Sequence, residues 1–182
     1  MIDLLEIQHY LEPTSIVQEG QEEFLPTHIG HHTFFNEFAF GEMHTLDLVI
    51  IGCGEHRGHQ ASATFSQGAD NVRQVFYQMH HWHEHIRIGD IGNIKQGDTL
   101  NDTRAALRTV INELQTAGKK VLVLGGSHDL TLEQYNAYKL RDELVDVCVI
   151  DSLADIEQGP VADDKSFLME MLTGTPNYVR HL

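Results

Sequence analysis

The chain has 182 residues and carries 12 Lys and Arg against 27 Asp and Glu, so its formal net charge is −15. This acidic balance argues against binding to duplex nucleic acid, because such binding needs clustered basic side chains that displace counterions from phosphates. No stretch approaches the ~18 consecutive apolar residues of a membrane span, and the first residues lack the basic start of a signal peptide, so we expect a soluble, cytoplasmic protein.

Residues 1–45 are expected to form an N-terminal arm, because prolines and glycines interrupt any sustained apolar period there. A short helix over residues 1–11 is expected within it. Four phenylalanines near its end would anchor the arm on the core: Phe34, Phe35, Phe38 and Phe40. Residues 46–182 are expected to form one α/β domain.

From residue 46 onward, short apolar runs alternate with segments of helical periodicity. The apolar runs predict strands over residues 46–52, 86–91, 121–124 and 145–150. Helices are expected over residues 68–79, 102–116, 131–138 and 164–172. Strands that alternate with helices pair in parallel through right-handed crossovers, so we expect a three-layer αβα fold with a mainly parallel sheet.

Local signals add detail to three of these elements. In the helix over 68–79, apolar residues recur with the i, i+3, i+4, i+7 spacing of a buried stripe: Val72, Val75, Phe76 and Met79. The helix that begins at Thr131 is expected to start with a capping box formed with Gln134. The second strand is expected to break at Gly89 and Gly92, because glycine weakens strands.

Two cysteines, Cys53 and Cys148, both fall inside apolar runs that predict strands. A small secreted scaffold would carry more cysteines in turn-rich contexts. Buried, reduced thiols are therefore expected.

Three loops follow predicted strands at their carboxyl ends, where open parallel sheets bind ligands. These loops comprise residues 52–58, 125–129 and 151–155. Neighbouring strands would bring the last two loops to one rim, so we expect His128, Asp151 and Asp155 to lie together. One imidazole and two carboxylates suit Mn²⁺, Mg²⁺ or Zn²⁺.

The order of these motifs resembles the ureohydrolase superfamily, which comprises arginase, agmatinase and formimidoylglutamase. The resemblance extends over about residues 46–155. Residues 125–131 are most similar to the family's Gly-Gly-x-His-Ser-x-Thr element, and residues 151–155 are similar to its Asp-x-His-x-Asp motif. Residues 68–77 and 88–92 look like its Gly-x-x-x-x-Arg-x-x-x-Tyr helix and its Asp-x-Gly loop.

The resemblance implies a partial arginase-like fold and the N-terminal part of an enzyme of this kind. It implies hydrolysis of a small amidine or guanidino substrate by hydroxide held between two Mn²⁺ ions. His128 and Asp155 would bind the first ion, and Asp151 would bridge both. Among the members of this family, formimidoylglutamase is the one that the motifs of this sequence resemble most.

Two departures from the family pattern bear on activity. Leu153 stands where the family's motif has its central His, and leucine cannot bind a metal. The later Ser-x-Asp-x-Asp element has no counterpart before Leu182. We therefore expect the chain alone to be inactive, and the alternative is a degenerate homologue that binds a ligand or partner without catalysis.

The resemblance also predicts open strand edges. In the family fold, strands from the C-terminal half lie between the third and fourth strands expected here. If those two strands do not pair directly, they expose apolar edges, which favours self-association.

Simpler roles remain open for the proposed ligands and for the histidine-rich segment. His128 would instead bond a helix N-terminus, and Asp151 and Asp155 would cap the following turn. In residues 80–85, His81 and His85 would stand at i, i+4 and chelate a transition metal if the preceding helix continued. We interpret that segment as a solvated polar one.

Residues 52–58 contain a Gly-x-Gly pattern, but its spacing differs from that of a dinucleotide-binding loop. In the ureohydrolase interpretation this loop, with Glu55, His56 and Arg57, borders the substrate entrance. Ser127, His128 and Asp129 are sequence neighbours, whereas a hydrolytic triad assembles in space, so they do not predict one.

Overall fold

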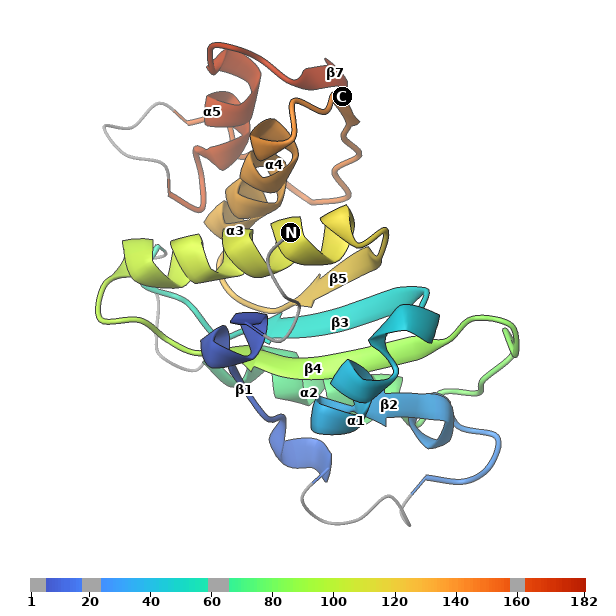
Figure 1. Ribbon diagram of the computed structural model, residues 1–182. Coiled ribbons are helices and arrows are strands. Elements are labelled where there is room, and N and C mark those ends of the chain that lie inside the picture. The colour runs from blue at the N-terminus through green and yellow to red at the C-terminus, as the bar shows by residue number, and fades with distance from the viewer. Residues whose placement is uncertain (1–5, 18–23, 59–65, 158–162) are drawn as a thin grey trace.

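The computed structural model describes residues 6–17, 24–58, 66–157 and 163–182, and its main element is a mostly parallel sheet (Figure 1). The strands of this sheet are β1 (Leu11–Glu12), β2 (Thr33–Phe35), β3 (Leu48–Cys53), β4 (Ile88–Ile94) and β5 (Lys120–Leu124). Their order is β1-β4-β3-β5, with β2 also paired to β4. Only β1 is antiparallel to its neighbour in this sheet. The predicted mainly parallel sheet is confirmed.

Helices lie on both sides of this sheet and beyond its β5 edge (Figure 1). The α-helices are α1 (Asn36–Gly41), α2 (Gly68–Phe76), α3 (Leu100–Thr116), α4 (Thr131–Leu140) and α5 (Phe167–Thr173). Short 3-10 helices are Glu6–Tyr10, Ser15–Val17, Ile29–His32, Met43–Thr45 and His128–Leu130. A separate parallel pair joins β6 (Val145–Asp146) to β7 (Val179–His181).

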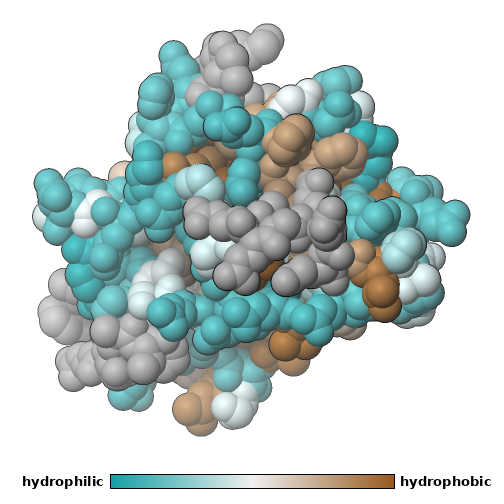
Figure 2. Space-filling view, turned by 90° about the horizontal axis from the view of Figure 1, so that it is seen from below, coloured by the Kyte–Doolittle hydropathy of each residue, from teal (hydrophilic) through white to brown (hydrophobic). Residues whose placement is uncertain are grey.

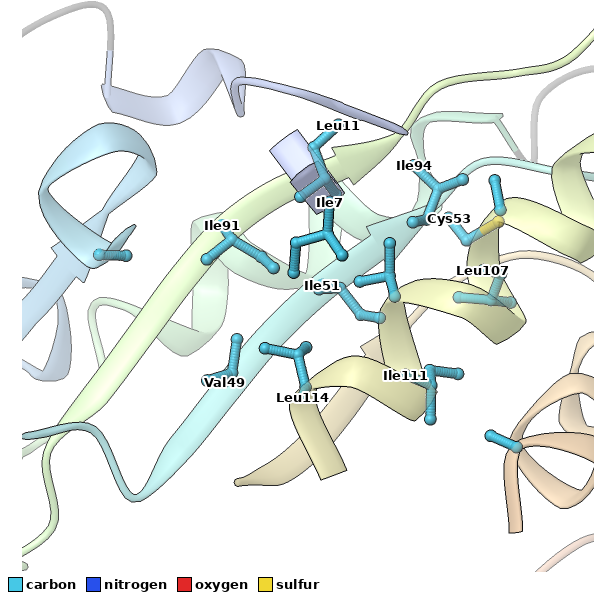
Figure 3. Packing of buried hydrophobic residues seen from close by; sticks show 14 of the residues in the cluster. Ile7, Leu11, Val49, Ile51, Cys53, Ile91, Ile94, Leu107, Ile111 and Leu114 are labelled. Carbon is cyan, nitrogen blue, oxygen red and sulfur yellow. The ribbon is translucent and has the colours of Figure 1, made fainter. Parts of the chain in front are cut away.

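α3 covers one face of the sheet with a continuous apolar stripe. Its start is fixed by a capping box, in which Thr99 Oγ1 accepts from the Asp102 N–H and the Asp102 carboxylate accepts from the Thr99 N–H. The stripe packs on β3 in a cluster that includes Val49, Ile51, Cys53, Leu107, Ile111 and Leu114 (Figure 3). Full burial of an aliphatic side chain contributes about 1.5–3 kcal/mol, so this contact positions β3 and its loop.

The other face of the sheet meets α2, but not through the predicted stripe. Of its four residues, Phe76 is partly buried against a core cluster that includes Ile50. Val72, Val75 and Met79 point to solvent, and Val75 is 69% exposed. The buried positions of this helix and its end are Ala69, Arg73 and Tyr77. The prediction of the helix was right, and the prediction of its buried side was wrong.

A buried carboxylate explains why α2 turns its arginine inward. Nε of Arg73 donates to Oδ2 of Asp90 at 2.7 Å, and its NH2 group donates to Oδ1 at 2.9 Å. The Tyr77 hydroxyl donates to the same Asp90 carboxylate. A guanidinium with a bidentate carboxylate partner can be buried, whereas an unpaired one cannot. The free energy gained from this ion pair therefore exceeds the cost of leaving three apolar side chains exposed to water.

β4 runs through both glycines that were expected to break it. A Cβ at Gly89 would lie 2.3 Å from Cδ1 of Leu46, and one at Gly92 would lie 2.1 Å from the carbonyl oxygen of Glu12. The glycines permit close approach of neighbouring segments to the strand, so the prediction of a break was wrong.

The first 45 residues add strands to the sheet where the structure describes them. β1 and β2 both pair with β4, and α1 follows β2 directly. The helix predicted over residues 1–11 is a 3-10 helix over Glu6–Tyr10, while residues 1–5 lie outside the described residues. Of the predicted anchors, Phe35 is buried and Phe38 is exposed.

The C-terminal segment departs most from prediction. The strand expected over 145–150 is regular only in β6, which pairs with β7 and not with β5. Ile150 is 97% exposed, and Cys148 is exposed although it was expected to be buried. α4 has no side-chain cap at its start, because the 3-10 helix His128–Leu130 runs straight into it.

Hydrophobic residues at the surface form several separate groups among hydrophilic ones on the face seen in Figure 2. Among the residues described, no helix combines the length and apolar character needed to cross a membrane. Both cysteines are free thiols.

Candidate metal centre

Two glycines shape the loop that follows β5. Gly125 and Gly126 have φ angles of +79° and +84°, a region that disfavours residues with a Cβ. A Cβ at Gly126 would also lie 2.2 Å from Cδ1 of Leu130 and 3.0 Å from the carbonyl oxygen of Cys53. The glycines let the chain turn sharply into the 3-10 helix, which places His128 at the carboxyl end of β5.

His128, Asp151 and Asp155 converge at this end of the sheet. Nδ1 of His128 lies 3.1 Å from Oδ2 of Asp155 and 3.6 Å from Oδ2 of Asp151. One ligand atom from each residue lies within 4.8 Å of the other two. No other group of three or more His, Cys, Asp and Glu side chains within the described ranges converges in this way. The structure thus brings together the three residues predicted to meet.

Asp151 is held in place by backbone donors. The N–H of Ser152 donates to its Oδ1 atom at 2.6 Å, and the N–H of Leu153 donates to the same atom at 3.4 Å. These hydrogen bonds hold the pKa of Asp151 below its ordinary value. Because Oδ2 remains directed at His128, the turn-capping role and the ligand role are compatible in one carboxylate.

Asp155 is positioned by α5 and the residues around it. Its carbonyl oxygen accepts a hydrogen bond from the N–H of Leu168 at 3.1 Å, and its side chain is 11% exposed. The ring of Phe167 meets the ring of His128 edge-on, with centroids 6.5 Å apart. The His128 side chain is 58% exposed, so the site is open to solvent on its imidazole side.

This donor set fits one divalent cation. Ligand atoms bound to one ion at about 2.1 Å lie about 3 Å from one another, so small side-chain movements would complete the arrangement. A nitrogen and two carboxylate oxygens suit Mn²⁺, Mg²⁺ and Zn²⁺. Leu153 is 75% exposed and offers no donor atom.

A buried ion pair beside His128 was missed from the sequence. Nε of Arg104 donates to Oδ2 of Asp129 at 3.1 Å, and Asp129 is fully buried. The pair ties the residue after His128 to α3. The sequence did contain a sign of this pair. Arg104 stands three residues before Leu107, so it lies on the same side of α3 as the apolar stripe.

The loop after β3 braces the same region. The Arg57 guanidinium donates to the Glu55 carboxylate and to the carbonyl oxygens of Gly97 and Asp98. Burial opposes ionisation of Glu55, but hydrogen bonds from Arg57 prevail and lower its pKa to about 2. The carbonyl oxygen of Glu55 accepts from the N–H of Ser127 at 3.0 Å. Arg57 and Glu55 therefore position the loop that carries His128.

The histidine-rich segment lies at the other end of the sheet, in the connection that enters β4. α2 ends at Phe76, so His81 and His85 do not share a helical face. The ring of His81 instead stacks on that of His32, with centroids 4.4 Å apart.

Three comparisons relate this chain to known proteins. A model of the arginase family matches residues 46–174. Formimidoylglutamase from Klebsiella pneumoniae (strain 342) is 32% identical over 87 residues, which cover 46% of this chain and 27% of that protein. The chain thus matches about a quarter of the length of this curated relative.

Solved structures with the same fold include formiminoglutamase from Trypanosoma cruzi with Mn²⁺. It matches with a TM-score of 0.62 and 18% identity, over 75% of this chain and 52% of that one. Formimidoylglutamase from Bacillus subtilis matches with a TM-score of 0.61 and 12% identity, over 75% of this chain and 47% of that one. The predicted arginase-like α/β fold is confirmed by these likenesses.

Proposed function

The chain belongs to the arginase family, and on that premise we propose that it forms the N-terminal part of a metal-dependent hydrolase acting on C–N bonds of a small guanidino or formimino substrate. The observation that carries this proposal is the convergence of His128, Asp151 and Asp155 beyond β5. We favour formimidoylglutamase activity, because curated relatives bear that name. The two free thiols are consistent with a cytoplasmic location.

Mn²⁺ is the ion proposed for this site, with His128 and Asp155 as its ligands and Asp151 facing it through Oδ2. A bound ion of this kind lowers the pKa of water and polarises the substrate. Nδ1 of His128 faces the Asp155 carboxylate, so a metal bound through Nδ1 needs the tautomer with the ring proton on Nε2. Protons also compete with a metal for the imidazole and the two carboxylates. Metal affinity is therefore expected to fall as the pH is lowered.

We propose that the chain by itself does not catalyse the reaction. Leu153 replaces the histidine of the family motif, and the described residues provide one set of three ligands. One ion held in this way lacks the second ion that the family's chemistry uses.

The test is an assay of the Mn²⁺-loaded chain with arginine, agmatine and formiminoglutamate, with urea or formamide as the products measured. We expect one Mn²⁺ per chain and no product. Leu153→His should raise the stoichiometry toward two, because it restores the missing ligand. Product release by the unaltered chain would refute the inactivity, and failure of both proteins to bind Mn²⁺ would refute the assignment of His128, Asp151 and Asp155 as metal ligands.

The alternative is a homologue that binds a partner without catalysis. Ile150 and Leu153 are exposed apolar residues beside the three ligands, which favours a docking role for this rim. If another protein binds to this rim in the presence of excess chelator, that would support this alternative over the metal-dependent hydrolase.

Self-association is proposed for the same end of the molecule. β5 is an edge strand of the described sheet, and Leu122 in its middle is exposed. Ile150, next to Asp151 in the chain, is exposed as well. An unpaired, apolar strand edge is a template for association with another chain. We propose that two copies cover this edge together.

A further inference from the structure

Two stacked imidazoles join the segment before β2 to the connection that enters β4. His32 ends a 3-10 helix, and His81 lies between α2 and β4. Their ring centroids are 4.4 Å apart at an interplanar angle of 20°, and the ring of His31 meets that of His32 edge-on at 5.1 Å. All three side chains line one cavity of about 460 Å³. We call the two segments, residues 27–32 and 77–81, the histidine junction.

Backbone hydrogen bonds also hold the histidine junction together. The N–H of Gly30 donates to the carbonyl oxygen of Tyr77 at 2.9 Å. The N–H of His81 donates to the carbonyl oxygen of Thr27 at 2.8 Å. The stacked rings are therefore carried by two segments whose backbones are already in contact.

The ring proton of His32 is used in a hydrogen bond. Nε2 of His32 lies 2.7 Å from the carbonyl oxygen of Pro26, and a carbonyl oxygen can only accept, so Nε2 carries the proton of the neutral ring. A second proton would go to Nδ1 and make the ring a cation. A proton on His81 as well would place two positive charges in one stack, where they repel each other.

The surroundings of His81 favour its neutral form. Burial lowers the pKa of His81 below its ordinary value of 6.5, and the nearby His32 lowers it further. His80 and His83 act in the same direction, whereas Glu84 opposes them. A histidine whose pKa is lower in the folded state than in the unfolded state stabilises the fold above its ordinary pKa, and this contribution is lost as the pH falls. The histidine junction should therefore weaken in acid.

Few carboxylates face the histidine junction. Glu84 is the one carboxylate among the described residues that line the cavity, and Arg87 adds a cation to the same lining. Arg87 is itself 3.2 Å from the carboxylate of Glu42. Nδ1 of His28, within the junction, is buried and has no hydrogen-bond partner in the described part of the chain, so a proton there would find no acceptor.

We propose that the histidine junction is an acid-sensitive contact: as the pH falls from about 7.5 to about 5, protonation of His32 and His81 separates their rings and releases one segment from the other. Histidine clusters are suited to this because their charge changes in this range of pH. The contact does not depend on the function proposed for the His128 rim.

Opening of the histidine junction exposes aromatic side chains but leaves the sheet intact. The ring of Phe24 lies beside those of Phe35 and Tyr77, with centroids 6.4 and 6.1 Å away. Phe24 precedes the junction in the chain, so these two rings gain exposure to solvent when the junction opens. β2 remains paired with β4. Apolar surface would thus become available for binding at low pH alone.

The test is amide hydrogen exchange of the full chain, followed by NMR at about pH 7.5 and about pH 5. Rates are expressed as protection factors relative to an unstructured peptide at the same pH. Protection of the Gly30 and His81 amides should fall about 10-fold or more at the lower pH, because each linked proton changes the opening equilibrium up to tenfold per pH unit. Protection in β3 should stay the same, since the opening is local.

A variant without the titrating ring separates the role of charge from that of stacking. His81→Phe keeps a flat ring in the stack but cannot take a proton, so protection of the Gly30 amide should stay nearly constant between the two pH values. The matched control is His85→Phe, because the ring of His85 meets that of His83 rather than that of His81. This control should lose protection as the unaltered chain does.

Circular dichroism of each variant establishes that it is folded, and NMR titration of the His81 ring in the unaltered chain gives an independent measurement. We expect that ring to titrate below 6.5. Titration at or above 6.5, unchanged protection at about pH 5, an equal loss in His81→Phe, or a loss that extends to β3 would each overturn the proposal.

Discussion

Nδ1 of His128 lies 3.1 Å from Oδ2 of Asp155, although the two residues are 27 positions apart in the chain. The contact joins the loop after β5 to the segment before α5, and these segments share no sheet hydrogen bonds in the described structure. Tight glycine turns, the buried Arg104–Asp129 pair and the bond from Leu168 to Asp155 hold the two sides in place. The proposed metal centre therefore depends on several contacts outside its own ligands.

Replacement of Gly126 by Ala should disrupt the loop that carries His128. The new Cβ would meet Leu130 at 2.2 Å on a backbone with φ of +84°, so we expect a loss of about 2–4 kcal/mol in unfolding free energy. Gly118→Ala is the control, because its φ is +76° but its surroundings are open, and it should cost about 1 kcal/mol. Equal losses in urea denaturation would contradict the role given to the close approach.

The buried pair of Arg73 and Asp90 should matter far more than an exposed pair. Asp90→Asn leaves a buried guanidinium without its charge partner, so we expect a loss of about 3–5 kcal/mol in unfolding free energy. Arg87→Gln removes the exposed contact with Glu42 and should cost less than about 1 kcal/mol. Urea denaturation of both variants checks this, and similar losses would show that α2 is not held by its buried arginine.

Glu55 should make the stability of the fold depend on pH in the acid range. Its pKa is lowered from 4.5 to about 2, so its ionised form stabilises the folded state above pH 4.5. That contribution, about 3 kcal/mol at most, is lost as the pH falls from 4.5 toward 2.

Denaturation curves of Glu55→Gln at several pH values test this prediction. In this variant the unfolding free energy should change less between pH 4.5 and pH 2 than in the unaltered protein. Glu37→Gln, in the first turn of α1, is the control and should keep the slope of the unaltered protein. An unchanged slope in Glu55→Gln would mean that its bonds to Arg57 do not stabilise the fold.

A charge on the exposed apolar rim should reduce self-association. Ile150→Glu places a carboxylate where the side chain is 97% exposed, so folding should be unaffected. Light scattering over a range of concentrations is expected to show a dimer for the unaltered chain and a monomer for this variant. Val75→Glu makes a similar change on α2 and should remain dimeric, whereas a monomeric unaltered chain would refute the proposal.

The sequence predicted the central sheet well because β3 and β5 are short apolar runs that are followed closely by glycine. β3 and β5 lie within one or two residues of their expected limits, and α3 follows its apolar stripe. The apolar periodicity did not predict the buried side of α2, because the burial of Arg73 depends on Asp90, which lies 17 residues away. The positions of apolar residues in a sequence do not reveal a charge partner so far along the chain.

The proposed site was predicted from strand ends, although one of the two strands is not as expected. Residues 147–150 are irregular, yet Asp151 and Asp155 still reach His128 through the turn at Ser152 and the contact with α5. The contribution of Glu55, Arg57 and Arg104 was missed, because it rests on pairings that only the folded chain defines.

Titration of the chain with Mn²⁺ at pH 7.5, followed by calorimetry, tests the central claim most directly. We expect one saturable site that is lost in His128→Ala and kept in His44→Ala, a change at an exposed histidine of the 3-10 helix Met43–Thr45. Mn²⁺ binding that is equal in both variants, or absent from the unaltered chain, would contradict the assignment of His128, Asp151 and Asp155 as metal ligands.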